Sequence, residues 1–150
     1  MRHPLRVFAL ALAFAATPAC AALAPPDLPN PLAAAQSLDQ RAYALLHAYA
    51  AVVEEAADIA ADPAAPIAFK RLLGEAERVA TPSVELLQTA ITAYLRARAD
   101  FEAASGASQT TLDRAAIAFA VAMRRLNEAI EAAQAPIAEL SGLVRARRER

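Results

Sequence analysis

Residues 112–144 read LDRAAIAFAVAMRRLNEAIEAAQAPIAELSGLV, and this stretch decides the fold. Apolar residues recur along it at alternating steps of four and three, which places them on one face of a helix that packs against other helices. They are Leu112, Ala116, Phe119, Met123, Leu126, Ile130, Ala133, Ile137, Leu140 and Val144. Thr110 and Asp113 form a weak capping box at its start. Pro136 interrupts the backbone hydrogen bonds but not the spacing, so we expect either one long helix kinked there or a helix followed by a shorter collinear one.

The same spacing recurs in the segment after residue 36. A capping box of Ser37 and Gln40 predicts the start of this helix. Its apolar positions are Leu38, Ala42, Leu45, Tyr49, Val52, Ala56 and Ile59. Asp62-Pro63 ends it, because a residue before proline avoids the helical conformation.

Proline and glycine divide the residues between these two segments into two further helices. The first covers residues 66–79, and its apolar positions are Ile67, Phe69, Leu72, Leu73 and Ala76. Thr81-Pro82 then has the form of an N-cap followed by proline at the first helical position. The helix that begins there extends to about Ser105, before Gly106. Its apolar positions are Val84, Leu87, Ile91, Tyr94, Leu95 and Phe101.

The composition agrees with a helical protein. The hydrophobic fraction is 57 %, but alanine contributes much of it and tryptophan is absent. Alanine is the best helix former and has little side chain to bury, so the core should be thin. No segment alternates as a strand would, and short connections favour antiparallel neighbours. We therefore predict an all-α fold, an antiparallel bundle of about four helices over residues 37–150.

The N-terminal segment has the layout of a bacterial export signal. Arg2 and Arg6 precede an apolar run over residues 7–16, which is shorter than a membrane-spanning helix. Small residues around Cys20 predict cleavage between positions 19 and 22, so residues 1–20 form a signal peptide. The Pro/Ala-rich residues 21–36 then form an extended linker ahead of the bundle.

Ala19 and Cys20, placed after this short apolar run, resemble the bacterial lipoprotein signal. The resemblance implies that Cys20 is lipidated and becomes the first mature residue. It also implies sorting to the outer membrane, because Ala21 rather than aspartate follows. Thr17 and Pro18 depart from the pattern of that family, and two alternatives stay open: simple cleavage with loss of Cys20, and an uncleaved anchor.

The residues after this segment carry none of the common chemical motifs. His47 is their only histidine and has no cysteine companion, which removes the usual zinc and di-iron arrangements. No Cys-x-x-Cys-His is present for haem, and the three glycines stand too far apart for a phosphate-binding loop. We therefore predict a non-enzymatic protein without a metal or cofactor site, with His47 on its surface.

Charged residues gather at two places. Glu55, Asp58 and Asp62 share one face of the first helix, as a weak cation site or as a solvated face that pairs with arginines. The arginines expected to pair with them are Arg96, Arg98, Arg124 and Arg125. The second place is a basic tail of Arg145, Arg147, Arg148 and Arg150, which would contact an anionic partner or only suit the dipole of a helix end. The net charge of −1 gives no footprint for nucleic acid.

These observations favour an exported bacterial envelope protein, either periplasmic or attached to the outer membrane through Cys20, with secretion as the alternative. Its expected role is that of an interaction or structural module for a protein partner in the envelope. A second hypothesis is a periplasmic small-ligand-binding bundle. Its pocket would be lined by Tyr43, Tyr49, Phe69, Tyr94, Phe101 or Phe119. A third hypothesis is a homo-oligomeric coiled coil formed through the stripe of residues 112–144.

Overall fold

The computed structural model describes residues 37–149, and the expectations for residues 1–36, Cys20 among them, lie outside this part. The described residues form three α-helices: α1 (Leu38–Ala61), α2 (Ile67–Ala103) and α3 (Gln109–Arg148), with a short 3-10 helix η2 (Ala104–Gly106) between the last two. No strand occurs among them, which confirms the predicted all-α class. The expectation of about four helices is wrong for this part of the chain, because the two helices expected between residues 66 and 105 are one.

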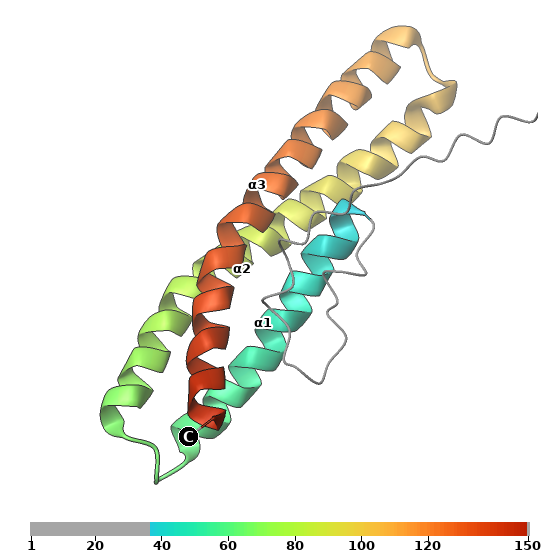
Figure 1. Ribbon diagram of the computed structural model, residues 1–150. Helices are drawn as coiled ribbons and strands as arrows, with labels where there is room; N and C mark the ends of the chain where they lie inside the picture. The colour runs from blue at the N-terminus through green and yellow to red at the C-terminus, as the bar shows by residue number, and fades with distance from the viewer. Residues whose placement is uncertain (1–36, 150) are drawn as a thin grey trace, which may run out of the picture.

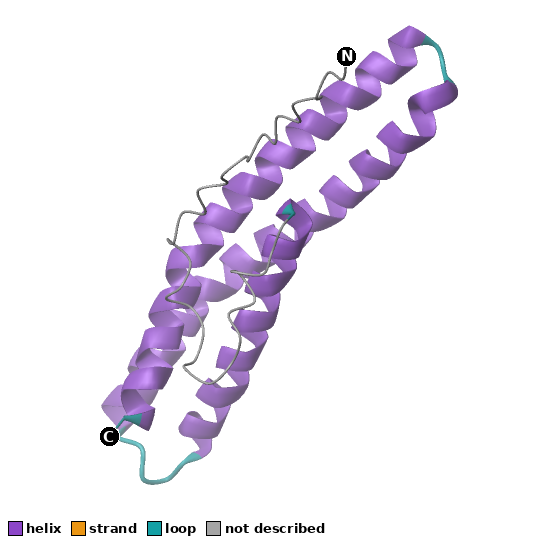
Figure 2. Ribbon diagram, turned by 45° about the vertical axis from the view of Figure 1, so that its right-hand side comes forward, coloured by secondary structure: helices purple, strands orange, loops and turns teal. Residues whose placement is uncertain are grey.

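The long helices α2 and α3 form an antiparallel hairpin, and α1 lies along only one half of it (Figures 1 and 2). With a rise of about 1.5 Å per residue, α2 and α3 are about 55 and 60 Å long and α1 about 36 Å. The half that α1 covers contains the start of α2 and the end of α3. Beyond the start of α1, the hairpin continues as two helices only.

The predicted boundaries of α1 are confirmed, and local hydrogen bonds explain them. Ser37 is the N-cap residue, and its backbone N–H donates to Oε1 of Gln40 at 3.2 Å. Asp62 is the C-cap residue, with extended backbone angles as expected for a residue before proline. Its Oδ1 accepts from the N–H of Ala64 at 2.8 Å, which shapes the turn into α2.

The predicted helix break at Thr81-Pro82 is wrong, since α2 continues through it. The local preference against a helix is overridden by tertiary packing: Ala80 and Val84, on either side, are buried. The Thr81 hydroxyl also donates to the carbonyl of Glu77 at 2.9 Å. Because that bond uses its single proton, the Tyr49 hydroxyl of α1 is the donor in the 2.8 Å bond to Thr81 Oγ1.

The last helix is continuous through Pro136, as the first of the two alternatives predicts. Figure 1 shows that α3 bends in its second half. Its start differs from the prediction, because the N-cap residue is Ser108 rather than Thr110. Asp113 does not cap the backbone as expected; its Oδ1 accepts from the side-chain amide of Gln109 at 2.7 Å.

The core is a narrow row of aliphatic side chains between the three helices. The largest fully buried ones are Leu45, Leu87, Leu126, Ile130, Ile137 and Leu140. Four residues predicted for the core are exposed instead: Ile67, Leu72, Leu95 and Met123. On α3 the buried positions Ala122, Leu126 and Ile130 follow two successive steps of four, because a helix of 3.6 residues per turn drifts away from a heptad. On α2 the buried face contains Leu73, Ala80 and Leu87. Leu72 therefore points outward.

None of the helices in the described part of the chain combines the length and the apolar content needed to cross a membrane.

Candidate functional site

The predicted acidic face and the predicted basic tail come together at one end of the molecule. Arg147 Nη2 lies 3.3 Å from Asp62 Oδ2, and Arg148 Nη2 lies 2.7 Å from Glu55 Oε1. They meet because the end of α3 runs beside the end of α1. The antiparallel hairpin therefore uses two of the four tail arginines to neutralise acids of α1.

None of the four arginines expected as partners of these acids pairs with them in the described residues, so that expectation is wrong, and two of the four pair elsewhere. Arg98 binds Glu102 one turn further along α2 at 2.9 Å and approaches Asp39 at 3.9 Å. Arg124 pairs with Glu128 on its own helix at 3.7 Å. The arginines of these pairs are exposed to solvent, so the pairs contribute little to stability.

The electrostatics of Asp62 follow from its position in the turn after α1. The N–H of Ala64 donates to this carboxylate, and Arg147 and Lys70 add positive charge nearby. Together they lower the pKa of Asp62 from its ordinary value of 3.8. The carboxylate is therefore ionised in the folded protein across the neutral range.

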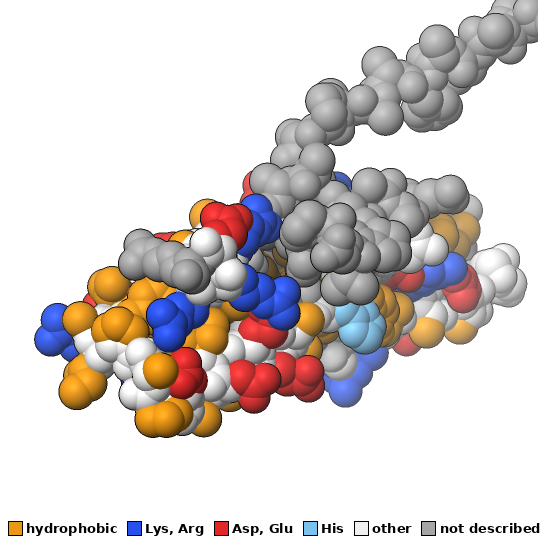
Figure 3. All heavy atoms as spheres, turned by 60° about the horizontal axis from the view of Figure 1, so that its bottom comes forward, with side chains coloured by type: hydrophobic (Ala, Val, Ile, Leu, Met, Phe, Trp, Pro, Cys, Tyr) orange, Lys and Arg blue, Asp and Glu red, His pale blue; other side chains and the backbone are white. Residues whose placement is uncertain are grey.

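An open hollow of about 340 Å³ lies over this charged cluster. It is lined by Glu55, Asp58, Ile59, Asp62, Arg147 and Arg148. Figure 3 shows red and blue side chains next to each other on the face that also carries the pale-blue His47. Because both charges are present, the hollow has no single sign that would select an anion or a cation.

The described residues contain no group of three or more His, Cys, Asp or Glu side chains that could hold a metal ion. His47 is exposed on α1, as predicted. Arg145 and Arg147 are partly buried and Arg148 is exposed, while the fourth tail residue, Arg150, lies outside the described part.

The aromatic side chains considered for a ligand pocket do not form one group. Tyr94 and Phe119 have ring centroids 5.5 Å apart, and Phe101 stacks on Phe119 at 5.6 Å. Tyr49 instead binds Thr81, and Tyr43 is 43 % exposed.

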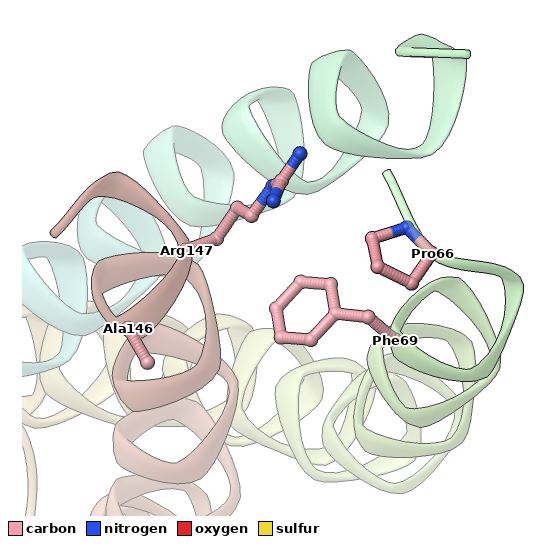
Figure 4. A pocket seen from close by; sticks show the side chains of 4 residues that line it. All are labelled: Pro66, Phe69, Ala146 and Arg147. Atoms are coloured by element: carbon pink, nitrogen blue, oxygen red, sulfur yellow. The ribbon is translucent and has the colours of Figure 1, made fainter. Parts of the chain in front are cut away.

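Phe69 lies in the first turn of α2, at the other end of the hairpin from Phe101 and Phe119. There it lines a cavity of about 30 Å³ together with Pro66, Ala146 and Arg147 (Figure 4). Such a cavity has room for about one water molecule and none for a ligand of ordinary size.

Two apolar surfaces among the described residues were not predicted. One is the part of the hairpin beyond α1, where Ile117 is 67 % exposed. The other is a row on α2 formed by Leu72, Val79 and Leu86, which are 49, 52 and 62 % exposed. Their regular spacing of seven residues is visible in the sequence, but the expected helix break at Thr81-Pro82 divided the row between two helices.

The chain matches no family model, and neither the curated proteins nor the solved structures contain a significant match to it.

Proposed function

We propose that this protein is an exported, non-enzymatic interaction module of the bacterial envelope, attached to a membrane through Cys20. In this proposal, the part of the α2–α3 hairpin beyond α1 binds a protein partner. We call this part, together with the residues level with the first turn of α1, the hairpin tip, and it comprises residues 93–120.

The observation that carries the proposal is that the hairpin tip has two helices where the rest of the bundle has three (Figure 1). Arg98 reaches Asp39 in the first turn of α1, which marks where the third helix begins. Above this level, Phe101 and Phe119 stack on each other but stay partly exposed. A two-helix layer with half-covered aromatic rings is a suitable surface for a helix of another protein.

Exposed aliphatic residues on the hairpin tip support the same conclusion. Ile117 is 67 % exposed and Leu95 is 38 % exposed. Together with the partly exposed rings of Phe101 and Phe119, they add apolar surface to both helices of the hairpin tip, and exposed apolar surface commonly marks a binding site. The mixed charges at the base of the molecule, in contrast, largely satisfy one another through Arg147 and Arg148.

The sequence ahead of α1 supports the proposed location. A segment with the layout of an export signal, then Cys20 and then a proline-rich segment precede Ser37. A folded domain carried on a semi-rigid linker needs no cofactor or catalytic group to act as a binding module.

Site-specific photo-cross-linking of the full-length protein in living cells tests this proposal. A photoreactive residue at Ile117 should give an adduct of defined mass with one envelope protein. The same residue at Ala138, which is exposed on the other half of α3, is the matched control. Absence of an adduct at Ile117, or the same adducts at both positions, would overturn the proposal, as would turnover of an envelope substrate by the purified protein.

A further inference from the structure

The outer face of α2 carries an apolar row that neither α1 nor α3 covers. Leu72, Val79 and Leu86 stand seven residues apart and therefore lie on one side of the helix. Their neighbours Leu73, Ala80 and Leu87 are buried in the core, so the row borders the core without belonging to it. We call Leu72, Val79 and Leu86 the α2 ridge.

The α2 ridge repeats every seven residues, which is the period of a coiled-coil heptad. A complete seam has two apolar positions in each heptad, and the ridge supplies one of them. Residues with this spacing stay on one stripe when two helices pack with a left-handed crossing. Large aliphatic residues are scarce in this alanine-rich chain, and most of the leucines in the described part are at least partly buried. Three exposed large aliphatic residues at a regular spacing on a single helix therefore indicate an interface rather than scattered surface residues.

We propose that the α2 ridge binds the α2 ridge of a second copy of this chain in an antiparallel pair. The ridge reads the same in both directions, with leucine at each end and valine in the middle. A two-fold axis at Val79 therefore brings Leu72 of each copy against Leu86 of the other. A surface that is its own complement under two-fold rotation is what a symmetric dimer requires.

Charges beside the ridge select the antiparallel orientation. Arg71 and Glu85 are exposed on the same flank, each seven residues from Arg78, and neither has an ion pair with another described residue. In an antiparallel pair the same flank of both helices meets, so Arg71 of each copy approaches Glu85 of the other. Arg78 lies next to the axis and faces its own counterpart.

This interface is separate from the hairpin tip and does not rest on the proposed function. The stripe of α3 that suggested self-association packs inside the chain's own core, so Leu126, Ile130 and Ile137 are unavailable for a dimer. In the proposed dimer, the α2 ridge rather than the stripe of α3 forms the interface between the two copies. Its formation would leave the two hairpin tips free for a partner.

Sedimentation velocity of the full mature chain over a range of concentrations tests the dimer. The wild type should shift from monomer to dimer mass, and Val79→Glu should weaken association by at least about tenfold, because it places two carboxylates at the axis. Gln88→Glu, an exposed change on the same helix outside the ridge, is the control and should leave association unchanged. Circular dichroism verifies that each variant keeps its helical content.

Charge reversal tests the orientation. Arg71→Glu and Glu85→Arg should each weaken the dimer several-fold, and the double variant should restore it, because the two ion pairs are re-formed with their signs exchanged. Arg78→Glu mixed with the wild type should form the heterodimer in preference to either homodimer. A wild-type chain that stays monomeric up to about 1 mM, or a double variant weaker than both single ones, would overturn the proposal. Neither result would affect cross-linking at Ile117.

Discussion

At the scale of single residues, Thr81 links α2 to α1 directly beside Pro82. Its hydroxyl donates to Glu77 within α2 and accepts from Tyr49 across the helix interface, one residue before Pro82. The proline leaves α2 without one backbone N–H at the next position. The Thr81 hydroxyl does not replace this bond, because it donates to Glu77, whereas the carbonyl that loses its donor is that of Arg78. Its bond with Tyr49 ties α2 to α1 at this level.

Removing this hydroxyl should destabilise the bundle. Thr81→Val leaves the partly buried Tyr49 hydroxyl without its acceptor, and we expect the free energy of unfolding to fall by about 1–2 kcal/mol. Tyr49→Phe should cost less, about 0.5–1.5 kcal/mol, because it removes both the donor and the need for a partner. Urea denaturation of both single variants and the double variant measures the coupling. Strictly additive effects would contradict the bond between these side chains.

The lowered pKa of Asp62 predicts how stability depends on pH. Its folded-state pKa lies below the ordinary value of 3.8, chiefly because Ala64 donates to it and then because of Arg147. The stabilisation is thus fully present above pH 3.8 and is lost as the pH falls through the folded-state value. We expect Asp62→Asn to reduce the loss of stability below pH 4. Denaturation curves from pH 2 to 6 test this, with Asp100→Asn as the control, and an unchanged slope for Asp62→Asn would contradict it.

Residue-scale features were predictable where they depend on neighbours in sequence. Ser37 and Asp62 end α1 as expected because capping and proline act within a few residues. The partners of the acids were not predictable in the same way. Arg147 and Arg148 reach Asp62 and Glu55 only because the ends of α1 and α3 lie side by side, which depends on the number of helices.

At the scale of elements, α2 shows packing overriding a local signal. A threonine-proline pair normally begins a helix, yet here it lies in the middle of one of 37 residues. The periodic burial of Leu73, Ala80, Leu87 and Tyr94 continues across it without a break. A stripe that keeps its register through a proline is therefore evidence for one helix. The same holds at Pro136, where the sequence left two alternatives open and α3 is continuous.

If Pro82 is only tolerated, replacing it should strengthen α2. Pro82→Ala supplies the missing N–H within the helix, and alanine has an intrinsic advantage of about 3 kcal/mol over proline at an interior position. We expect the free energy of unfolding to rise by about 1–3 kcal/mol, because Pro82 is exposed and its replacement disturbs no core packing. Thermal and urea denaturation measure the change. A decrease in stability would show that the backbone at this site requires proline.

At the scale of the whole molecule, the all-α antiparallel architecture was predictable from the spacing of apolar residues. The lengths of the helices were not predictable in this way. Because the tip exists only where α2 and α3 extend beyond α1, the hairpin tip was not predicted either. A bundle of four similar helices would cover all its apolar faces. Three helices of 24, 37 and 40 residues cannot, so both the hairpin tip and the α2 ridge stay exposed.

The proposed anchor belongs to this scale as well, because it decides where the whole molecule resides. In a Gram-negative host, the wild type should partition with membranes and carry an acylated Cys20 at its mature N-terminus. Cys20→Ser should move the protein to another fraction or leave its precursor uncleaved. Mass spectrometry of the N-terminal peptide from membrane and soluble fractions measures both. A soluble wild type that begins after Cys20 would contradict lipidation while still supporting export.

The start of α1 beside the middle of the hairpin has a consequence for how the molecule would be suspended. Because α1 begins beside the hairpin, Ser37 lies between the two ends of the molecule rather than at one of them. About 36 Å of α1 separate Ser37 from the charged end of the molecule, and the hairpin tip extends in the other direction. Under the proposed attachment through the N-terminal segment, the anchor therefore acts on the side of the bundle and leaves both of its ends uncovered.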